Sequence, residues 1–278
     1  MTVLEVLQAT TAHFKKRNVD SPRLNAEHLL AHVLRHKRIE LYLEFERVLT
    51  EPELAPLREL VKRRAEGEPL QHLLGTVEFC GHLFHCDKRA MVPRPETEEL
   101  VELLKSEIKQ DKPRIVDVGT GSGVIALSLA AEFPAAEVLG VDISDDALAL
   151  ARQNAESLHL GHRVHLLKSN LLENVEGTFD LIVANLPYIS QQDRPSLSRE
   201  VLYDPDVAVF AGARGDELIH ELIAQSPPRL RAGGILALEI GLGQGEALIS
   251  ALAEKNYRDI YSKRDYSGVT RFLVARYG

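Results

Sequence analysis

Cysteine is scarce in this sequence, with Cys80 and Cys86 as the only two among 278 residues. Two cysteines exclude a disulfide framework, and their spacing excludes a C-x-x-C metal or redox motif. Long apolar runs are missing too, since none approaches the roughly 18 residues that a membrane span needs. The N-terminus, MTVLEVLQATTAHFKKR, has acidic and polar residues where a signal peptide needs an apolar block. We therefore expect a cytoplasmic protein with reduced cysteines and no membrane association.

Runs of basic residues are equally short. The formal net charge is −8, and no run of Lys and Arg exceeds Lys62-Arg63-Arg64. Residues 1–75 hold 12 of the 33 basic and 11 of the 41 acidic residues, so the acidity belongs to the rest of the chain. Proteins that neutralise many phosphates usually present a basic face. The composition therefore argues against a naked nucleic-acid substrate, and we expect no direct contact with nucleic acid.

Hydrophobic periodicity divides the chain into three segments. Residues 1–75 follow a helical pattern throughout and predict an all-helical domain, in which Ser21 is the expected N-cap and Pro22 the first residue of a second helix. Residues 76–93 place apolar side chains around Gly81 and predict a β-hairpin linker. Residues 94–278 form the third segment, which opens with a helix expected to run from the Pro93-Arg94-Pro95 entry through residue 109.

Strands and helices alternate from Pro113 onward. The expected strands are 114–118, 137–141, 164–168, 179–184 and 234–240, with a closing pair near 257–261 and 271–275. The expected helices are 124–133, 145–158, 215–230 and 245–254. This alternation predicts an α/β fold with a parallel, doubly wound sheet and right-handed crossovers.

A glycine-rich loop follows the first expected strand. Its candidate ligand-binding residues are Asp117, Gly119, Thr120, Gly121, Ser122 and Gly123. Glycine lets the backbone approach a ligand, and helix N-terminal amides favour polar groups. The dinucleotide fingerprint needs Gly at the third position after Gly121, where Val124 stands. The loop therefore favours a nucleoside without a pyrophosphate, S-adenosylmethionine above all, over a dinucleotide or a purely structural turn.

Two further strand ends supply candidate cofactor contacts. Asp142 ends the second strand 25 residues beyond Asp117, where a carboxylate can accept both hydroxyls of a ribose, and Ile143 follows it. Asn170 follows the third strand and is a candidate for the adenine edge, with Leu171 packing on the ring. An Asn in an ordinary strand-end turn is the alternative reading of Asn170.

The fourth strand ends in Asn185-Leu186-Pro187-Tyr188. A planar amide or aromatic amine is a poor nucleophile because its lone pair is delocalised, so a protein that alkylates one must hold it in a fixed pose. The Asn185 carboxamide and the Leu186 carbonyl can accept its two N–H groups, and Tyr188 can stack on its plane. The alternative is that Asn-x-Pro is only a turn signal.

These motifs together resemble the HemK/PrmC family, which methylates the side-chain amide of glutamine in peptide-chain release factors. The likeness covers nearly the whole chain and includes further segments: Glu68-Pro69-Leu70-Gln71-His72, Gly75, Glu78-Phe79, Pro93-Arg94-Pro95-Glu96-Thr97-Glu98 and Glu239-Ile240-Gly241. The resemblance implies a class I methyltransferase fold, which is Rossmann-like with a mostly parallel seven-stranded sheet, for residues 94–278. It also implies S-adenosylmethionine as cofactor, S-adenosylhomocysteine as product and a release factor as partner.

The chain departs from the family pattern at two places. Leu186 stands where the family usually has Pro; the group contributed there is a backbone carbonyl, which Leu can supply in the extended conformation that Pro187 favours. Asn-Leu-Pro-Tyr also resembles ribosomal-RNA adenine dimethyltransferases. Asn170-Leu171 stands where many relatives have Asp-Trp or Asp-Leu.

Other polar residues have structural interpretations. Arg94 and Thr97 lie in a helix entry that the resemblance places near the cofactor, and capping or packing is the plainer role for them. Glu239 can be a buried structural carboxylate. His28, His32 and His36 share a helical face, but the apolar residues between them form the core face, so we interpret the histidines as a solvated or partner-facing stripe. Cys80, His82, His85 and Cys86 cluster in the hairpin, where the alternation of a strand divides them between two faces, which a metal site does not suit. We predict no metal.

Three functional hypotheses follow. The leading one is a monomeric protein-glutamine methyltransferase whose helical domain grips the release factor. An RNA or DNA adenine methyltransferase is second, favoured by the Leu186 motif and opposed by the acidity of the chain. A non-enzymatic nucleotide-binding module is third.

Overall fold

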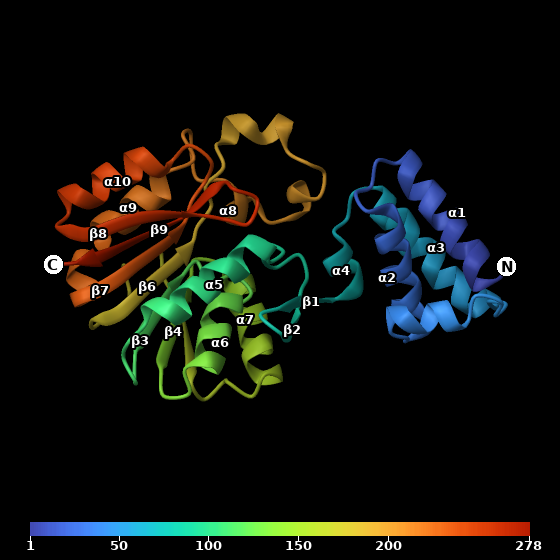
Figure 1. The fold of residues 1–278 in the computed structure, drawn as a ribbon, viewed down its shortest axis with the longest axis horizontal. Helices are drawn as coiled ribbons and strands as arrows, with labels where there is room; N and C mark the ends of the chain where they lie inside the picture. The colour runs from blue at the N-terminus through green and yellow to red at the C-terminus, as the bar shows by residue number, and fades with distance from the viewer. The chain divides into compact units, whose positions relative to one another are not determined.

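A computed structural model describes all residues, 1–278, and groups them into two compact units (Figure 1). The helical unit comprises Met1–Thr76 and Ser198–Tyr203, and the sheet unit comprises Val77–Leu197 and Asp204–Gly278. The chain therefore passes three times from one unit to the other. No helix in either unit has both the length and the apolarity to cross a membrane.

The helical unit is built from three longer helices and several short ones. They are α1 (Val3–Lys16), α2 (Pro22–Leu34), the 3-10 helix η1 (Arg38–Leu43), α3 (Glu51–Ala65), α4 (Leu70–Leu74) and the 3-10 helix η3 (Val201–Tyr203). Their apolar faces enclose one core, with Leu7, Phe14, Leu30 and Leu41 almost fully buried. The helical periodicity of residues 1–75 is thus explained by burial of one face of each helix.

The start of α2 differs from the prediction. Ser21 has a left-handed backbone (φ 44°) and its side chain caps nothing. The buried Asn25 instead donates from Nδ2 to the carbonyls of Asp20 and Ser21 at 2.8 and 3.2 Å. Pro22 does stand at the first helical position, where its missing N–H costs no hydrogen bond.

A buried arginine connects the two sequence segments of the helical unit. Arg64 donates from Nε to Asn25 Oδ1 at 2.6 Å and from Nη1 to the Glu68 carbonyl at 3.0 Å. Its Nη2 forms an ion pair with Glu200, which comes from the segment Ser198–Tyr203. A buried guanidinium needs such partners on every side, so this arginine ties residues far apart in the sequence into one unit.

The sheet unit contains a seven-stranded, mostly parallel sheet, which confirms the predicted fold class. Its strands, in spatial order, are β5 (Val164–Lys168), β4 (Glu137–Asp142), β3 (Arg114–Val118), β6 (Phe179–Asn185), β7 (Leu230–Glu239), β9 (Thr270–Tyr277) and β8 (Tyr257–Arg264). The first five are parallel, whereas β9 is antiparallel to both β7 and β8. A separate pair, β1 (Thr76–Phe79) and β2 (His82–His85), forms the predicted hairpin.

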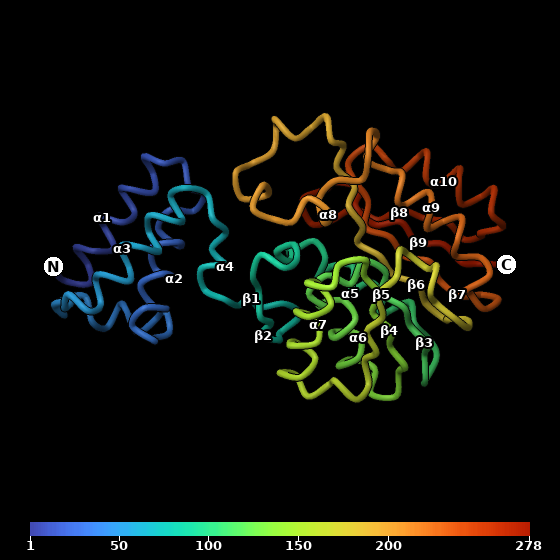
Figure 2. Tube along the Cα trace, turned by 180° about the vertical axis from the view of Figure 1, so that it is seen from behind, coloured from blue at the N-terminus to red at the C-terminus, as the bar shows by residue number.

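Helices cover both faces of this sheet (Figure 1, and from behind in Figure 2). Helices α5 (Pro95–Glu107) and α6 (Val124–Glu132) pack on one face, and α9 (Glu217–Gln225) and α10 (Gly245–Glu254) on the other. Helix α7 (Asp145–Ser157) follows β4. Successive strand residues point to opposite faces, so that Leu181 and Val183 join the α5/α6 core and Ile182 and Ala184 the α9/α10 core.

One predicted helix was too long and one strand too short. The helix expected over 215–230 ends at Gln225, and Pro227–Arg229 form a single 3-10 turn. Proline has no N–H to donate and its ring clashes with the preceding turn, so Pro227 and Pro228 prevent continuation. Leu230, taken for helix, already belongs to β7 and pairs with Phe179. The other sheet-unit elements agree closely, except that the closing strands are longer than expected.

The connection from β6 to α9 is mostly irregular. It contains the 3-10 helix η2 (Gln191–Ser196), η3 and the short helix α8 (Asp206–Val209). An isolated parallel bridge pairs Ile189, near the start of this connection, with Phe210, which directly follows α8.

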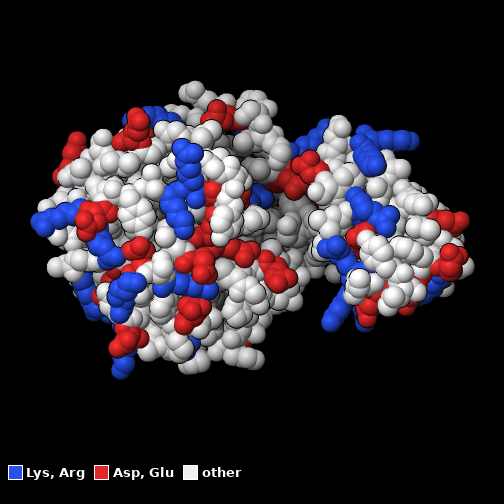
Figure 3. Space-filling model, viewed as in Figure 1, with Lys and Arg blue, Asp and Glu red and all other residues white.

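Charge on the surface is mixed. On the face drawn in Figure 3, Lys and Arg side chains alternate with Asp and Glu over both units, and no continuous basic stripe is visible.

Gly123 and Gly81 offer a matched test of the glycine loop's packing. Both have positive φ, 84° and 75°, so alanine strains either backbone by about 1–2 kcal/mol. A Cβ at Gly123 would meet Leu127 Cδ1 at 3.1 Å and Ala151 Cβ at 3.2 Å, whereas nothing lies within 4 Å at Gly81. We expect Gly123→Ala to lower the free energy of unfolding by about 1–3 kcal/mol more than Gly81→Ala, measured by urea denaturation. Equal losses would contradict this packing argument.

Candidate active site

One cavity lies at the carboxyl ends of the parallel strands, where the strand order reverses. Strands β4 and β5 lie on one side of β3, and β6 and β7 lie on the other. The loops that leave β3 and β6 therefore diverge, and a crevice opens between them. The cavity is lined by the loop after β3 and by the ends of β4, β5 and β6.

Most of the candidate site residues line this cavity. They are Gly119, Thr120, Gly121, Ser122, Asp142, Ile143, Asn170, Leu171, Asn185, Leu186 and Pro187. Three candidates do not line it, namely Asp117, Gly123 and Tyr188. Asp117 accepts a hydrogen bond from Thr120, which lines the cavity. The Tyr188 hydroxyl and the cavity-lining Thr97 both bond to Glu239. Gly123 packs against Leu127 and Ala151.

The glycine loop is held against the neighbouring strands. The amides of Gly119 and Thr120 both donate to the Val141 carbonyl at 2.9 Å. Gly119 has φ 70°, and a Cβ there would stand 2.8 Å from Leu186 Cδ2. Glycine is therefore required at this position by conformation and by the close approach of the β6 end.

Asp142 organises the loop from the end of β4. Its Oδ2 accepts from the Gly121 amide and its Oδ1 from the Ser144 amide, both at 2.9 Å. Burial raises the pKa of this carboxyl, while these backbone amides oppose the shift. Each carboxylate oxygen has more than one acceptor site, so the group retains capacity for a pair of hydroxyl donors in the cavity.

Asp117 is fully buried behind the loop. Its Oδ2 accepts from Thr120 Oγ1 at 2.7 Å and from the Ala126 amide at 3.1 Å, whereas its Oδ1 has no partner. Burial raises the pKa of this carboxyl to about 7. A buried carboxylate oxygen without a donor is uncommon, and its lack of a partner favours the neutral, protonated form of this carboxyl.

The two residues predicted to contact adenine directly follow β5 and the intervening Ser169. Asn170 lines the cavity, but its Nδ2 donates to Glu173 Oε1 at 2.8 Å. Leu171 adopts a left-handed backbone (φ 48°) and is buried in the cavity wall. One of the two N–H groups of the Asn170 carboxamide is therefore engaged, and the role of this residue toward an adenine stays a prediction.

Asn185 ends β6 directly beside Glu239 at the end of β7. Its Nδ2 donates to Thr97 Oγ1 at 3.0 Å, and Thr97 Oγ1 donates to Glu239 Oε2 at 2.8 Å. The Tyr188 hydroxyl approaches Glu239 Oε1 at 3.4 Å. The sequence favours structural roles for Thr97 and Glu239. In the fold, Thr97 bonds to Asn185 and Glu239 to Tyr188, both members of Asn185-Leu186-Pro187-Tyr188, which we call the clamp.

Burial controls the protonation of this group. It raises the pKa of Glu239 to about 7, against the opposing effects of the Thr97 hydrogen bond and the Arg271 charge. It also raises the pKa of Tyr188 to about 12, with the Glu239 charge as the next cause. Tyr188 is therefore a neutral phenol at neutral pH.

Two segments that line the cavity are not among the site residues predicted from the sequence. One is the segment after the hairpin, which contributes Arg89, Ala90, Met91 and Pro93, and the other is the loop 205–210, which contributes Pro205, Val207, Ala208 and Phe210. Asp204 brings them together, because it accepts from the Val92 amide at 3.0 Å and from Arg94 Nη2 at 2.6 Å. These residues are more than 100 positions apart, so no local pattern marks the pairing.

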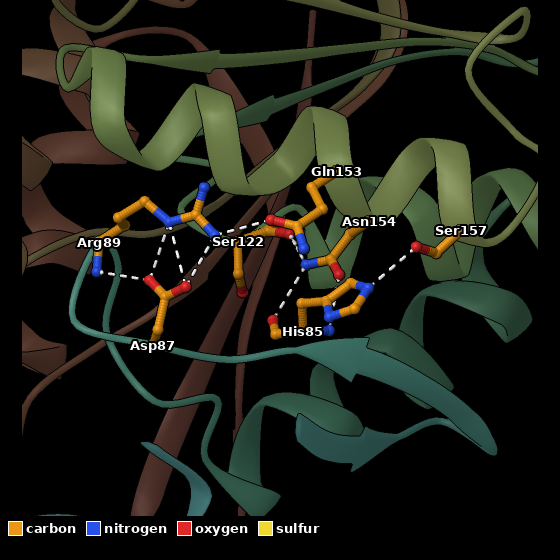
Figure 4. A network of polar contacts seen from close by, with 7 residues as sticks. All are labelled: His85, Asp87, Arg89, Ser122, Gln153, Asn154 and Ser157. Carbon is orange, nitrogen blue, oxygen red and sulfur yellow. Dashed lines mark hydrogen bonds and ion pairs between the residues drawn. The ribbon is translucent and has the colours of Figure 1, made fainter. Parts of the chain in front are cut away.

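A polar network ties the hairpin and the glycine loop to α7 (Figure 4). The carboxamide of Asn154, fully buried, accepts from the His85 amide at 2.7 Å and donates to the carbonyls of His85 and Ser122 at 3.2 and 2.9 Å. Arg89 binds Asp87 and Gln153 beside it. The loop that lines the cavity thus has a fixed attachment on its outer side.

In the hairpin cluster, His85 has a side-chain hydrogen-bond partner and both cysteines are protonated thiols. His85 Nε2 lies 3.0 Å from Ser157 Oγ, and burial raises the pKa of the Cys80 and Cys86 thiols to about 11 and about 12. The structure holds no group of three or more His, Cys, Asp or Glu side chains arranged for a metal ion.

Known proteins resemble the chain over nearly its whole length. The family model of the PrmC N-terminal domain matches residues 5–75, and that of the methyltransferase small domain matches residues 95–246. The release factor glutamine methyltransferase of Rhodopirellula baltica is 41% identical over 282 residues, covering 98% of this chain and 95% of that protein. The protein of the same name from Escherichia coli K12 is 38% identical over 259 residues, covering 93% of each.

Solved structures resemble the chain in fold. The hMettl16 catalytic domain has a TM-score of 0.57 at 17% identity and covers 82% of each chain. A T. thermophilus 16S rRNA methyltransferase in complex with AdoMet and guanosine has a TM-score of 0.53 at 20% identity, covering 73% of this chain and 50% of that one. At such identities the likeness concerns the fold alone.

The raised pKa of Asp117 predicts a pH dependence of stability. Between its ordinary value of 3.8 and about 7 the folded chain retains a proton that the unfolded chain has released. The free energy of unfolding therefore falls as pH rises through this window and levels off above it. We expect Asp117→Asn to make the fall shallower, by up to about 1.4 kcal/mol per pH unit, in urea titrations at pH 5, 6 and 7. An unchanged slope would show that Asp117 is ionised throughout.

Proposed function

The chain belongs to the family of release factor glutamine methyltransferases, and we propose that it transfers a methyl group from S-adenosylmethionine to glutamine in peptide-chain release factors. The acceptor is the side-chain amide nitrogen of the Gly-Gly-Gln motif. The observation that carries the proposal is 41% identity to a protein of that name across 98% of this chain, which includes both the helical and the sheet unit.

The residues around the cavity fit S-adenosylmethionine. Asp142 has acceptor capacity for the ribose hydroxyls, the glycine loop offers close backbone approach, and Leu171 offers an apolar surface for the base. The unpartnered Asp117 oxygen lies behind the loop that would hold the amino-acid part. When bound, the cofactor supplies a methyl group that its sulfonium has already made electrophilic.

The clamp residues then determine the pose of the nucleophile. The Asn185 carboxamide oxygen and the Leu186 carbonyl accept the two N–H bonds of the glutamine amide, and Tyr188 packs on the amide plane. A buried primary amide needs partners for both N–H groups. Fixing the nitrogen in line with the methyl group is an effect of orientation that can reach about 7–11 kcal/mol. The methylated amide loses its proton after the transfer, so no strong base is assigned.

The helical unit is proposed to bind the release factor. Residues 1–75 are near neutral in charge, which suits a protein partner more than a nucleic acid. The competing function, methylation of an exocyclic amine in RNA or DNA, is favoured by Asn-Leu-Pro-Tyr and opposed by the net charge of −8 and by the absence of any basic run longer than Lys62-Arg63-Arg64.

A methylation assay with two substrates tests the proposal. We expect labelled S-adenosylmethionine to modify the release-factor glutamine, located by mass spectrometry, and to leave ribosomal RNA unlabelled. Asn185→Ala should lower the rate of transfer at least about 100-fold while cofactor affinity changes little, because it removes an acceptor for the nucleophile. Label in RNA alone would reject the proposal, and a collapse of cofactor affinity in Asn185→Ala would move that residue to the cofactor site.

Asp142→Ala should have the reverse effect. Loss of its carboxylate removes the ribose acceptor and the support of the Gly121 and Ser144 amides. We expect the dissociation constant for S-adenosylmethionine to rise about 10- to 100-fold, measured by calorimetry. Unchanged affinity would contradict the ribose assignment.

A further inference from the structure

The orientation of the Asn185 carboxamide depends on its hydrogen-bond partner. The two ends of a carboxamide have the same shape, so the partners decide which end carries the oxygen. Thr97 Oγ1, 3.0 Å away, is the side-chain partner of Asn185. The question is therefore whether Thr97 must accept or can also donate to Asn185.

The hydrogen bond from Thr97 to Glu239 determines the answer, because the Thr97 hydroxyl has only one proton. A threonine hydroxyl has one proton to donate, and an ionised carboxylate can only accept. At 2.8 Å from Glu239 Oε2, the Thr97 proton is committed to the carboxylate. Thr97 Oγ1 can then only accept from Asn185, which turns Nδ2 toward Thr97 and leaves Oδ1 available for a donor. Thr97 and Glu239 are 3% and 2% exposed, so water does not compete for these bonds.

The same carboxylate also contacts the aromatic residue of the clamp. Its other oxygen, Oε1, lies 3.4 Å from the Tyr188 hydroxyl. Register explains why one group reaches both, since Asn185 and Glu239 are direct neighbours on β6 and β7. A single buried side chain therefore supports the two side chains that are assigned to the nucleophile.

We propose that Glu239 and Thr97 act as positioning residues that order the protons around Asn185, so that its oxygen faces the nucleophile and the site accepts only nucleophiles that donate N–H. The inference rests on the proposed function for the identity of the nucleophile, an amide nitrogen. A carboxamide turned the other way would present Nδ2 and repel the N–H groups of a glutamine. Thr97 lines the cavity and Glu239 does not, and both are assigned an effect through Asn185 and not on the nucleophile directly.

We call the hydrogen-bonded chain Asn185–Thr97–Glu239 the relay. The charges around Glu239 make its hydrogen-bond directions depend on pH. Helix α5 contributes Thr97 and the charge of Glu96, the segment after β6 contributes Tyr188, and β9 contributes Arg271. With burial included, the pKa of Glu239 is about 7. Below that pH the carboxyl gains a proton that it can donate to Thr97, which frees the Thr97 proton and removes the constraint on Asn185.

Removal of the Thr97 hydroxyl is the first test. We expect Thr97→Val to lower kcat for release-factor methylation about 10- to 100-fold, with the dissociation constant for S-adenosylmethionine within about threefold of wild type. Thr97→Ser keeps the hydroxyl and should recover most of the rate. Ser128→Ala removes another buried hydroxyl of the sheet unit, away from the cavity, and should leave kcat unchanged. A wild-type kcat in Thr97→Val, or a loss matched by lost cofactor affinity, would overturn the proposal.

The pH profile of kcat is the second test. A glutamine amide does not titrate in this range, so a fall of kcat below about pH 7 in the wild type must come from the protein. We expect Glu239→Gln to have a lower kcat that no longer changes between pH 6 and 8. A limb that persists in Glu239→Gln but vanishes in Asp117→Asn would assign it to Asp117 and overturn the role of Glu239.

Failure of the relay and failure of the proposed function give different results. If the wild type leaves release-factor glutamine unmodified, the function is wrong. If the wild type methylates it and Thr97→Val does so equally well, only the relay is wrong. A readout without activity is the side-chain NH₂ of Asn185 in ¹H–¹⁵N spectra, whose resonances should shift in Thr97→Val and stay near wild type in Ser128→Ala.

Discussion

The parallel pairing of β3 with both β4 and β6 is the constraint on which the site depends. Because the chain moves outward in one direction from β3 through β4 to β5, and then returns to the other side with β6, the loops after β3 and β6 leave in different directions. The resulting crevice is bordered by Gly119 on one side and Leu186 on the other, and a Cβ at Gly119 would have to displace the Leu186 side chain. The residues assigned to the cofactor or the nucleophile lie at, or directly after, the ends of β3, β4, β5 and β6.

Carboxylates, three of them buried and Asp142 half-buried, then hold the segments around that crevice in place. Asp117 and Asp142 accept from the glycine loop, Asp204 joins the segment after the hairpin to the segment 205–210 that contains α8, and Glu239 accepts from Thr97 and Tyr188. Burying a carboxyl is unfavourable unless hydrogen bonds compensate for lost water. The raised pKa values of Asp117 and Glu239 show that here the compensation is incomplete, which is typical of groups retained for function.

Much of the fold was predictable because local patterns and global packing agree. The strands over 164–168 and 114–118 and the helix over 245–254 have the predicted bounds. Errors arose where a local signal competed with another. The apolar pattern through residues 222–230 suited a helix, but two prolines ended it, and Leu230 found its partner in Phe179 on a distant strand. Ser21 does occupy the N-cap position of α2, but its left-handed backbone leaves its side chain without a capping hydrogen bond.

By itself, the sequence determined the alternation of strands and helices, the glycine loop, the acidic residue at the end of β4 and the Asn-Leu-Pro-Tyr motif. These are local features, set by backbone sterics and by the period of burial. Only the tertiary structure decided that Thr97 from α5, Asn185 from β6 and Glu239 from β7 form one hydrogen-bonded chain. It also decided that Asp117 and Tyr188 are not among the residues that line the cavity. Such contacts join residues up to 142 positions apart, and their direction depends on protons whose positions are settled only when every donor and acceptor in the buried group is in place.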